Sequence, residues 1–284
     1  MLAVASPQAS AQMPGNFQPL SAPQKSVDPN SVVAKMMREG GTEQGPAQQP
    51  WRFTKGKDHD KLPAEFQWDT PPTPVNTAYP VYPYQLLRTG VAGKIRAYFI
   101  IGPAGRVVKV ELDEAAAPEF GLAVRAMLDS CRFNPARKKD GTPAYANVGV
   151  EYAFEPKGRS DAPVAPEGRL ILRDLEKKPG NILGFQDLDE PLKPLSRQPP
   201  TYPIALLKTM PAGDAVVEFF VDVNGNVQLP HIKSSSAPEF GYAAVQAVAA
   251  WRFETPKKGG KVVVVRAEIP VGFEGRPAAT AQKP

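Results

Sequence analysis

The sequence has very few of the side chains on which disulfides and metal centres depend. Its 284 residues include one cysteine and two histidines, so Cys131 has no intrachain partner for a disulfide. His59 and His231 belong to different regions, and neither stands in a spacing typical of metal ligands. We expect Asp58-His59-Asp60, the one local cluster of this kind, to be a solvated polar loop rather than a metal chelate.

Motifs of enzymes and of nucleic-acid-binding proteins are also missing. Ser234-Ser235-Ser236 lacks a Gly-x-Ser-x-Gly context and a histidine placed as its base. Gly90, Gly93, Gly102 and Gly105 flank a predicted strand instead of opening a helix, which excludes a phosphate loop there. The net charge of +5 comes without a dense Lys/Arg block or a basic stripe with aromatic platforms. We therefore expect no enzymatic activity, no cofactor and no nucleic-acid partner.

Long apolar runs are absent as well. No run of about 18 apolar residues occurs, so the sequence predicts no transmembrane helix. Residues 1–5 are apolar, and Ala9-Ser10-Ala11 has the small-x-small form of a signal-peptidase site. We interpret residues 1–11 as the remnant of an export signal, which predicts a periplasmic location. The alternative is a plain disordered terminus.

Proline is abundant, with 33 residues that cluster between the apolar segments. This distribution predicts a mostly disordered region at 12–74, a linker at 157–194 and a disordered tail at 276–284. Because such a linker needs few contacts across it, we expect the segments on its two sides to unfold separately. Arg169 to Leu175 is a candidate additional strand within the linker.

The N-terminal region contains a few aromatic anchors among polar residues. We expect Trp51, Phe53, Phe66 and Trp68 to dock onto the folded unit that follows, and residues 31–39 to form a short helix. The alternative for the aromatic residues is a peptide-like motif that binds a partner.

Between these segments the chain repeats itself at a spacing of 120 residues. Tyr82-Pro83 recurs as Tyr202-Pro203, and Ala117-Pro118-Glu119-Phe120-Gly121 recurs as Ala237-Pro238-Glu239-Phe240-Gly241. A long stretch of similarity at one spacing is typical of a supersecondary unit used twice.

Each copy is expected to contain a hairpin, a helix and a third strand. Alternating apolar residues predict strands, Asn224-Gly225 predicts the hairpin turn, and apolar residues three and four apart after Pro238 predict an amphipathic helix. In the second copy the predicted elements are strands at 215–222, 227–234 and 262–271 and a helix from Pro238 to Trp251. Cys131 takes the place of Trp251 in the first copy, so we expect it to be buried.

The predicted fold is α+β, with two tandem small domains at 75–156 and 195–275. Each is expected to be a three-stranded antiparallel sheet with a long and a short helix packed on it. Domains of about 75 residues are near the lower size limit for independent folding.

The order of these pieces resembles the TonB carboxy-terminal domain. In the second copy they are Leu195-Ser196-Arg197, Tyr202-Pro203, Asn224-Gly225, Ser234-Ser235-Ser236 and Trp251-Arg252-Phe253. The first copy is less similar, because Cys131 replaces the tryptophan and Glu114-Ala115-Ala116 replaces the serines. The chain also departs from the usual plan of the family, since no inner-membrane helix and no long Pro/Glu/Lys spacer is visible.

The resemblance implies a non-catalytic periplasmic protein that supports transmembrane transport. Its implied partners are extended segments of outer-membrane TonB-dependent transporters, which add as a strand to the last strand of the sheet. Inner-membrane motor proteins become further partners if a membrane anchor precedes Met1. On this basis the partner-binding residues are predicted to be Val262, Val263, Val264, Val265, Arg266, Ala267, Glu268, Tyr202 and Pro203.

Two alternatives from other functional classes stay open at this point. In the first, the protein is a scaffold whose sheet edges pair with one another, between copies or between chains, and leave no edge for a ligand. In the second, it attaches to the cell envelope through the basic loops at Arg137-Lys138-Lys139 and Lys257-Lys258. Neither alternative includes a role in transport.

Overall fold

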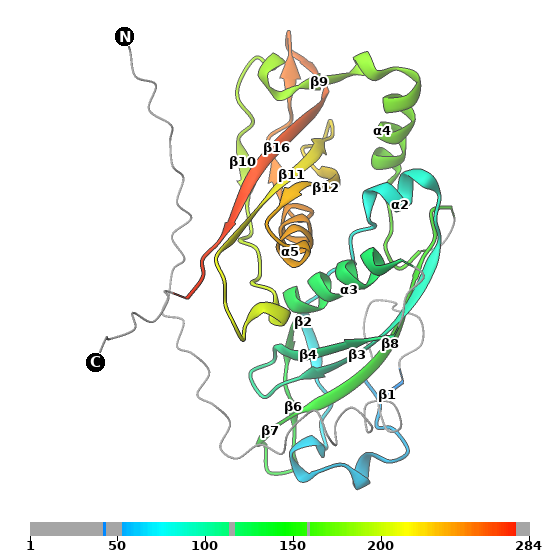
Figure 1. Cartoon of the computed structure of the whole chain (residues 1–284), viewed down its shortest axis with the longest axis vertical. Helices are drawn as coiled ribbons and strands as arrows, with labels where there is room; N and C mark the ends of the chain where they lie inside the picture. The colour runs from blue at the N-terminus through cyan, green and yellow to red at the C-terminus, as the bar shows by residue number, and fades with distance from the viewer. Residues whose placement is uncertain (1–41, 44–52, 114–116, 158–159, 277–284) are drawn as a thin grey trace, which may run out of the picture.

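The computed structural model describes residues 42–43, 53–113, 117–157 and 160–276, which form two α+β units packed together (Figure 1). Each unit contains an antiparallel hairpin, a crossing helix and a third strand, as the repeat predicts. The predicted fold class is confirmed.

In the first repeat, the three antiparallel strands are extended by a short parallel strand. The sheet order is β1-β8-β3-β4, with the helices α2 and α3 before and after the hairpin. The bounds are β1 Thr42–Glu43, α2 Tyr84–Thr89, β3 Gly93–Ile101, β4 Val107–Leu112, α3 Pro118–Ser130 and β8 Ala146–Phe154.

The second repeat has the same plan. Its sheet order is β12-β11-β16-β9, and β9 is again a short strand that pairs in parallel at the edge. The bounds are β9 Ile182–Gly184, the 3-10 helix η5 Ile204–Leu206, β11 Gly213–Val221, β12 Val227–Ser235, α5 Pro238–Val248 and β16 Val264–Phe273.

Short two-stranded ladders complete each repeat. β2 pairs with β5 in the first repeat and β10 pairs with β13 in the second, while each last strand is preceded by a small hairpin. The bounds are β2 Thr73–Asn76, β5 Arg132–Asn134, β6 Ala136–Arg137, β7 Pro143–Ala144, β10 Pro194–Ser196, β13 Arg252–Phe253, β14 Lys257–Lys258 and β15 Lys261–Val262.

A tyrosine holds the start of each repeat to its helix and its last strand. Tyr82 meets Phe120 and Phe154 edge-on, with ring centroids 5.9 and 5.4 Å away. In the second repeat Tyr202 meets Phe240 and Phe273 edge-on, at 5.7 and 6.2 Å. Edge-to-face pairs of this kind stabilise beyond the area they bury. The Tyr-Pro at the start of each copy is therefore a packing element.

The long helices end slightly earlier than the apolar spacing suggests. α5 ends at Val248, so Trp251 lies three residues beyond it. The indole is nevertheless buried, and its Nε1–H donates to the carbonyl oxygen of Gln198 at 2.8 Å. The expected burial of Cys131 at the equivalent site is confirmed, and burial raises the pKa of its thiol to about 11.

The N-terminal segment from residue 53 is folded onto the first repeat, although we expected 12–74 to be mostly disordered. Phe53 and Trp68 join the core of that repeat, and Phe66 packs with Tyr145. These contacts confirm docking for the three aromatic residues. Trp51 and the helix expected at 31–39 lie outside the described residues. The segment contains two 3-10 helices, η1 His59–Lys61 and η2 Ala64–Phe66.

The linker between the repeats contains a helix, which corrects the strand expected at Arg169 to Leu175. This helix, α4 Pro166–Lys177, begins with a proline at its first position, where the missing N–H costs nothing. Gly168 and Ile171 are its buried residues. Two 3-10 helices flank β9, namely η3 Pro179–Asn181 and η4 Phe185–Asp187.

The two repeats are in contact through their long helices, contrary to the expectation that few contacts cross between them. α3 and α5 lie against each other between the two sheets (Figure 1). Gln246 Nε2 donates to the carbonyl oxygen of Tyr79 at 3.1 Å, and the rings of Tyr84 and His231 stack 4.0 Å apart. Within the described residues the two repeats do not share a sheet.

A buried carboxylate lies in this contact between the repeats. Asp129, near the end of α3, is 4% exposed, and its Oδ2 accepts a hydrogen bond from the backbone N–H of Ile204 at 3.0 Å. Its Oδ1 is buried without a hydrogen-bond partner. Burial raises the pKa of Asp129 to about 6, against the opposing effects of that hydrogen bond and of Arg125 and Arg132.

The hairpin turn of the second repeat generates our first prediction. Gly225 and Gly259 both have a left-handed φ, 80° and 57°. A Cβ on Gly225 would lie 2.0 Å from the carbonyl oxygen of Phe253, whereas nothing lies within 4 Å of one on Gly259. Gly259→Ala should therefore cost about 1 kcal/mol of unfolding free energy and Gly225→Ala about 3 kcal/mol. Urea unfolding measures both, and equal losses would contradict the close approach at Gly225.

Asp129 generates a second prediction, on the pH dependence of stability. Because its pKa is raised in the folded state, the folded chain binds the extra proton, and stability falls as the pH rises from about 4 to about 6. Asp129→Asn keeps the shape and an acceptor but does not titrate there. Between pH 4 and pH 7 its stability relative to the wild type should rise by up to about 3 kcal/mol. Urea unfolding at several pH values tests this, and a constant difference would reject it.

Candidate functional site

The candidate site is the outer edge of β16, which is the side of this strand that faces away from β11. We choose it because the family resemblance of the sequence implies that a partner strand adds to the last strand of the sheet. On its inner side β16 pairs with β11 from Val265 to Phe273. On its outer side β9 covers only one end, pairing Ile182 with Val264 and Gly184 with Arg266. From Ala267 onward no strand among the described residues pairs with the outer edge.

The first repeat indicates which backbone groups of β16 face this edge. Ala153 on β8 uses its N–H and its C=O in hydrogen bonds with Asp161, away from the neighbouring strand. In the first sheet Ala153 pairs with Lys94. Asp214, which lies 120 residues after Lys94, is the equivalent of Lys94 in the second sheet, and it pairs with Gly272. Gly272 is therefore the equivalent of Ala153. Because backbone groups alternate along a strand, the residues whose groups face the edge are Val264, Arg266, Glu268, Pro270 and Gly272.

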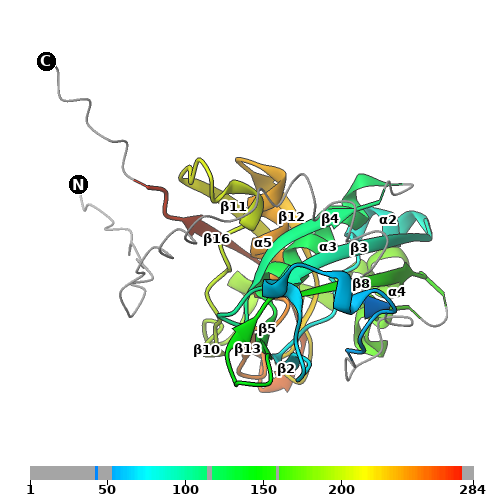
Figure 2. The ribbon, with the colours of Figure 1, turned by 90° about the horizontal axis from the view of Figure 1, so that it is seen from below.

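Pro270 limits the length of the usable edge. It has no N–H, and prolines within sheets are found where the nitrogen faces away from the paired strand, which agrees with this assignment. An added strand therefore finds consecutive outward N–H groups only at Val264, Arg266 and Glu268. Beyond Pro270, β16 still pairs with β11 as far as Phe273, whose side chain is buried, and Figure 2 shows the chain leaving the body of the molecule after the end of β16 (dark red).

The matching edge of the first repeat is more fully covered. β1 pairs with Val148 and Gly149. Further along β8, the carboxylate of Asp161 accepts the N–H of Ala153 at 2.8 Å, and the N–H of Asp161 donates to the carbonyl oxygen of Ala153 at 2.8 Å. The Ser160 hydroxyl donates to the same carbonyl oxygen. The backbone at this end of β8 is thus satisfied by the chain itself.

The side chains of β16 divide between the two faces of the sheet, as expected. Val265 and Ala267 are buried in the core of the second repeat, while Val264 and the preceding Val263 are half-buried. On the opposite face Arg266 lies over the Phe220 ring, 5.5 Å from its centroid, with Nε 3.9 Å from Glu218 Oε1. Glu268 forms an ion pair with Lys233. The charged side chains of the edge strand therefore contact neighbouring strands of its own sheet.

The structure does not bring all of the predicted site residues together. Val262 is exposed on the β14–β15 hairpin, where it pairs with Lys257. Tyr202 contacts Phe273, about 23 Å along the strand from Arg266 at the usual rise per residue. Its hydroxyl donates to the carbonyl oxygen of Pro211 at 2.6 Å, and Pro203 is buried. Tyr202 and Pro203 thus lie at the far end of β16 from Val264.

Sequence reasoning missed the segment that covers the edge. Ile182, Leu183 and Gly184 are half-buried, and they lie in the part of the chain assigned to the linker. Three apolar or small residues between Pro179 and Pro191 are too short a run to show a strand period.

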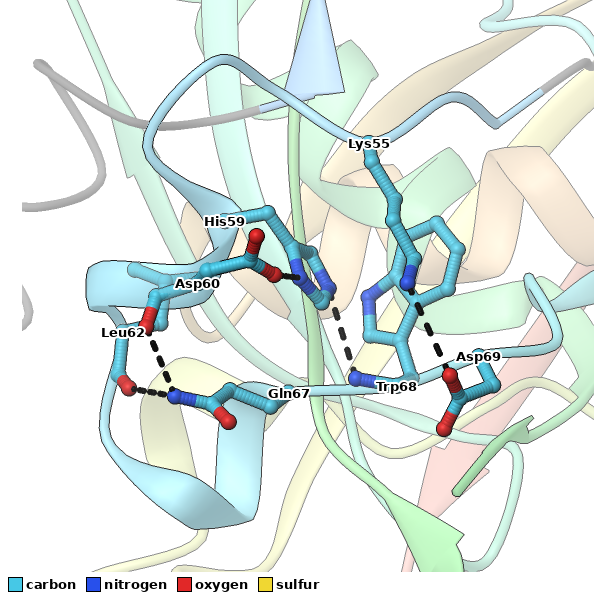
Figure 3. Close-up of polar contacts among 7 residues, drawn as sticks. All are labelled: Lys55, His59, Asp60, Leu62, Gln67, Trp68 and Asp69. Atoms are coloured by element: carbon cyan, nitrogen blue, oxygen red, sulfur yellow. Dashed lines mark hydrogen bonds and ion pairs between the residues drawn. The ribbon is translucent and has the colours of Figure 1, made fainter. Parts of the chain in front are cut away.

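The Asp58-His59-Asp60 cluster is only partly the solvated loop that we expect from the sequence: the Asp60 side chain is in solvent, whereas His59 is buried (Figure 3). The backbone N–H of Trp68 donates to His59 Nε2 at 3.3 Å, and the two rings meet edge-on at 4.8 Å. His59 Nδ1 lies 3.5 Å from Asp60 Oδ1. Burial lowers the pKa of His59, with Asp60 opposing that effect.

Within the part of the chain that the structure describes, no group of three or more His, Cys, Asp or Glu side chains is placed to hold a metal ion. A cavity of about 130 Å³ lies between the repeats, lined by residues that include Tyr84, Glu119, His231 and Tyr242. Pockets for small molecules are usually about 300 to 1,000 Å³.

The described residues contain no helix long and apolar enough to cross a membrane. A comparison with family models matches the chain twice, at residues 78–156 and 198–274, with the family described as Gram-negative bacterial TonB protein C-terminal. Together the two matches cover more than half of the chain.

Among solved structures, the chain is similar to the solution NMR structure of the Pseudomonas aeruginosa TonB CTD. The identity is 24%, the match covers 32% of this chain and 92% of that one, and the TM-score is 0.29. No curated protein matches the chain. From the two family matches, the chain belongs to the family of the Gram-negative bacterial TonB protein C-terminal domain and carries two tandem copies of that domain.

Proposed function

We propose that this protein is a non-catalytic periplasmic protein that binds extended segments of outer-membrane transporters by strand addition to β16. Membership in the TonB C-terminal family supports a TonB-type role in transport. The periplasmic location and the transporter partners follow from the resemblance to TonB domains.

The observation that carries the proposal is the outer edge of β16. It accepts a parallel strand at Val264 to Arg266, and no strand in the described part of the chain pairs with it beyond Arg266. An exposed edge offers main-chain donors and acceptors that an extended peptide can use, while alternate side chains supply specificity.

The second repeat is the better candidate for binding. At the corresponding edge of the first repeat, Asp161 and Ser160 already satisfy the backbone of Ala153. In the second repeat the groups of Glu268 face the edge beyond the end of β9. A ligand that covers Val264, Arg266 and Glu268 would have consecutive donors along the edge.

The scaffold alternative is less well supported within one chain, because the described strands of the two repeats belong to separate sheets. The scaffold hypothesis then requires that the β16 edges of two separate chains pair with each other. Attachment to the envelope would instead involve the basic hairpin at Lys257 and Lys258, whose side chains are exposed. The experiment below separates these possibilities.

The proposal predicts that Glu268→Pro nearly abolishes the binding of an extended peptide, while Glu268→Ala weakens it by roughly 0 to 1 kcal/mol. Both substitutions remove the ion pair with Lys233, but only proline removes the outward N–H. Peptides from the amino termini of transporters are titrated into the full chain, and amide shifts are followed by NMR. Thermal unfolding verifies that both variants are folded.

Three outcomes would contradict the proposal. Equal affinities of the proline and alanine variants would exclude main-chain recognition at Glu268. Shifts confined to Lys257 and Lys258 would favour envelope attachment. Concentration-dependent shifts of β16 without peptide would favour pairing of edges between chains.

A further inference from the structure

We propose that β9 is an internal occupant of the ligand-binding edge, which the partner strand must displace. This inference rests on the proposed function, because it concerns the same edge of β16. β9 pairs with Val264, Val265 and Arg266, and Val264 and Arg266 carry two of the three consecutive outward N–H groups. Since one edge can pair with only one strand at a time, β9 and a partner strand that covers Val264 and Arg266 compete.

The pairing of β9 is short enough to be displaced. The strand has three residues, whereas β11 pairs with β16 along nearly the whole of both strands. The N–H of Gly184, the last residue of β9, donates to Asp187 Oδ2 at 3.0 Å, so the ladder ends in a turn of the chain itself. Phe185, the next residue, is exposed. Loss of this ladder leaves the rest of the sheet paired.

The carboxylate of Asp189 helps to hold the segment after β9 in place. Asp189 Oδ1 accepts the N–H of Gly259 at 2.8 Å, and Oδ2 accepts the N–H of Gly260 at 3.1 Å. The N–H of Asp189 in turn donates to the carbonyl oxygen of Lys257 at 3.0 Å. These bonds fix the chain to the β14–β15 hairpin, which leads directly into β16. Asp189 therefore positions β9 without being part of the edge.

On its N-terminal side, β9 contacts α4 of the linker. Asn181 Nδ2 donates to Asp174 Oδ2 on α4 at 3.3 Å, and both side chains belong to the linker itself. Leu188, beyond η4, packs against the core of the second repeat. The segment between Asn181 and Leu188 is thus a strap whose C-terminal end is fixed to the second repeat by Leu188 and by the next residue, Asp189.

The strap also indicates what kind of ligand fits the edge. Its sequence at the pairing residues is Ile-Leu-Gly, it runs parallel to β16, and it carries no charge on these three residues. A synthetic copy of residues 180–188 is therefore a defined probe for the edge. Within the intact chain the tethered strap has an effective concentration of the order of millimolar, against which a free peptide competes poorly.

The test compares two variants that release the strap with one matched control. Leu183→Pro breaks the ladder of β9, and Asp189→Ala removes its anchor. The control is Glu190→Ala, because that carboxylate pairs with the exposed Lys193. If the strap covers the edge at least nine-tenths of the time, both releasing variants should bind the probe about ten-fold or more tightly than the wild type. Glu190→Ala should bind it as the wild type does.

Hydrogen exchange reads the pairing without any ligand. The amides of Val264 and Arg266 should exchange faster in Leu183→Pro and Asp189→Ala than in the wild type, while the amides of Val265 and Ala267, which face β11, stay protected. Unchanged protection of Val264 and Arg266 in Leu183→Pro would overturn the assignment of β9 as the occupant. Faster exchange with no gain in probe affinity would overturn the competition.

These outcomes are distinguishable from failure of the proposed function. If transporter peptides shift Glu268 equally in the wild type and in the released variants, the edge binds but the strap does not regulate it. If no transporter peptide shifts Val264, Arg266 or Glu268 even after release, the proposed function fails, and hydrogen exchange still reports whether β9 covers the edge.

Discussion

The outward backbone groups of the last strand in each sheet are the constraint on which this structure depends. A three-stranded sheet leaves the N–H and C=O groups of its edge strand without partners, and such an edge tends to pair with another chain. The first repeat satisfies its edge with β1 and with Asp161, which bonds both backbone groups of Ala153. The second repeat does so only in part, with β9 at one end and Pro270 further along. Two copies of one fold thus treat the same edge differently.

Because α3 and α5 are in contact, the two repeats pack against each other and are not independent domains joined only by a linker. α3 and α5 use one face for their own sheets and another for each other. That second face contains polar side chains, including Asp129 and Gln246, which the contact buries. Each of the two forms a hydrogen bond with a backbone group of the other repeat. A buried carboxylate with one unpartnered oxygen is costly when charged, so we expect this contact to weaken as the pH rises. The relative position of the two edges is therefore fixed by groups far from either edge.

The repeat, the α+β class and the faces of the strands could be predicted from the sequence, because they depend on local periodicity that both copies share. Val265 and Ala267 lie in the core, and Arg266 lies on the opposite face, as the alternation predicts. Features set by tertiary contact could not be predicted. Arg169 to Leu175 contains the apolar run Leu170-Ile171-Leu172, which short strands and helices share, and Pro166 starts a helix there that packs Gly168 close to Gln228 on β12. His59 is buried by Trp68, nine residues away, and β9 has only three residues to show a pattern.

The sequence predicts the candidate site only as one strand, and it does not show which part of that strand's edge is already covered. Family resemblance indicated the last strand, yet which amides face outward follows only from the bonds of Ala153 and from the register that relates it to Gly272. By that register, the outward backbone groups of Val264 and Arg266 that pair with β9 are the same groups that the proposed ligand would use. A chain that covers its own proposed binding edge with a three-residue strand avoids the hazard of an open edge and keeps the strand displaceable. The short ladder of β9 and the hydrogen bonds of Asp189 are then complementary in the proposal, because those bonds would return the strap to the edge once a partner leaves.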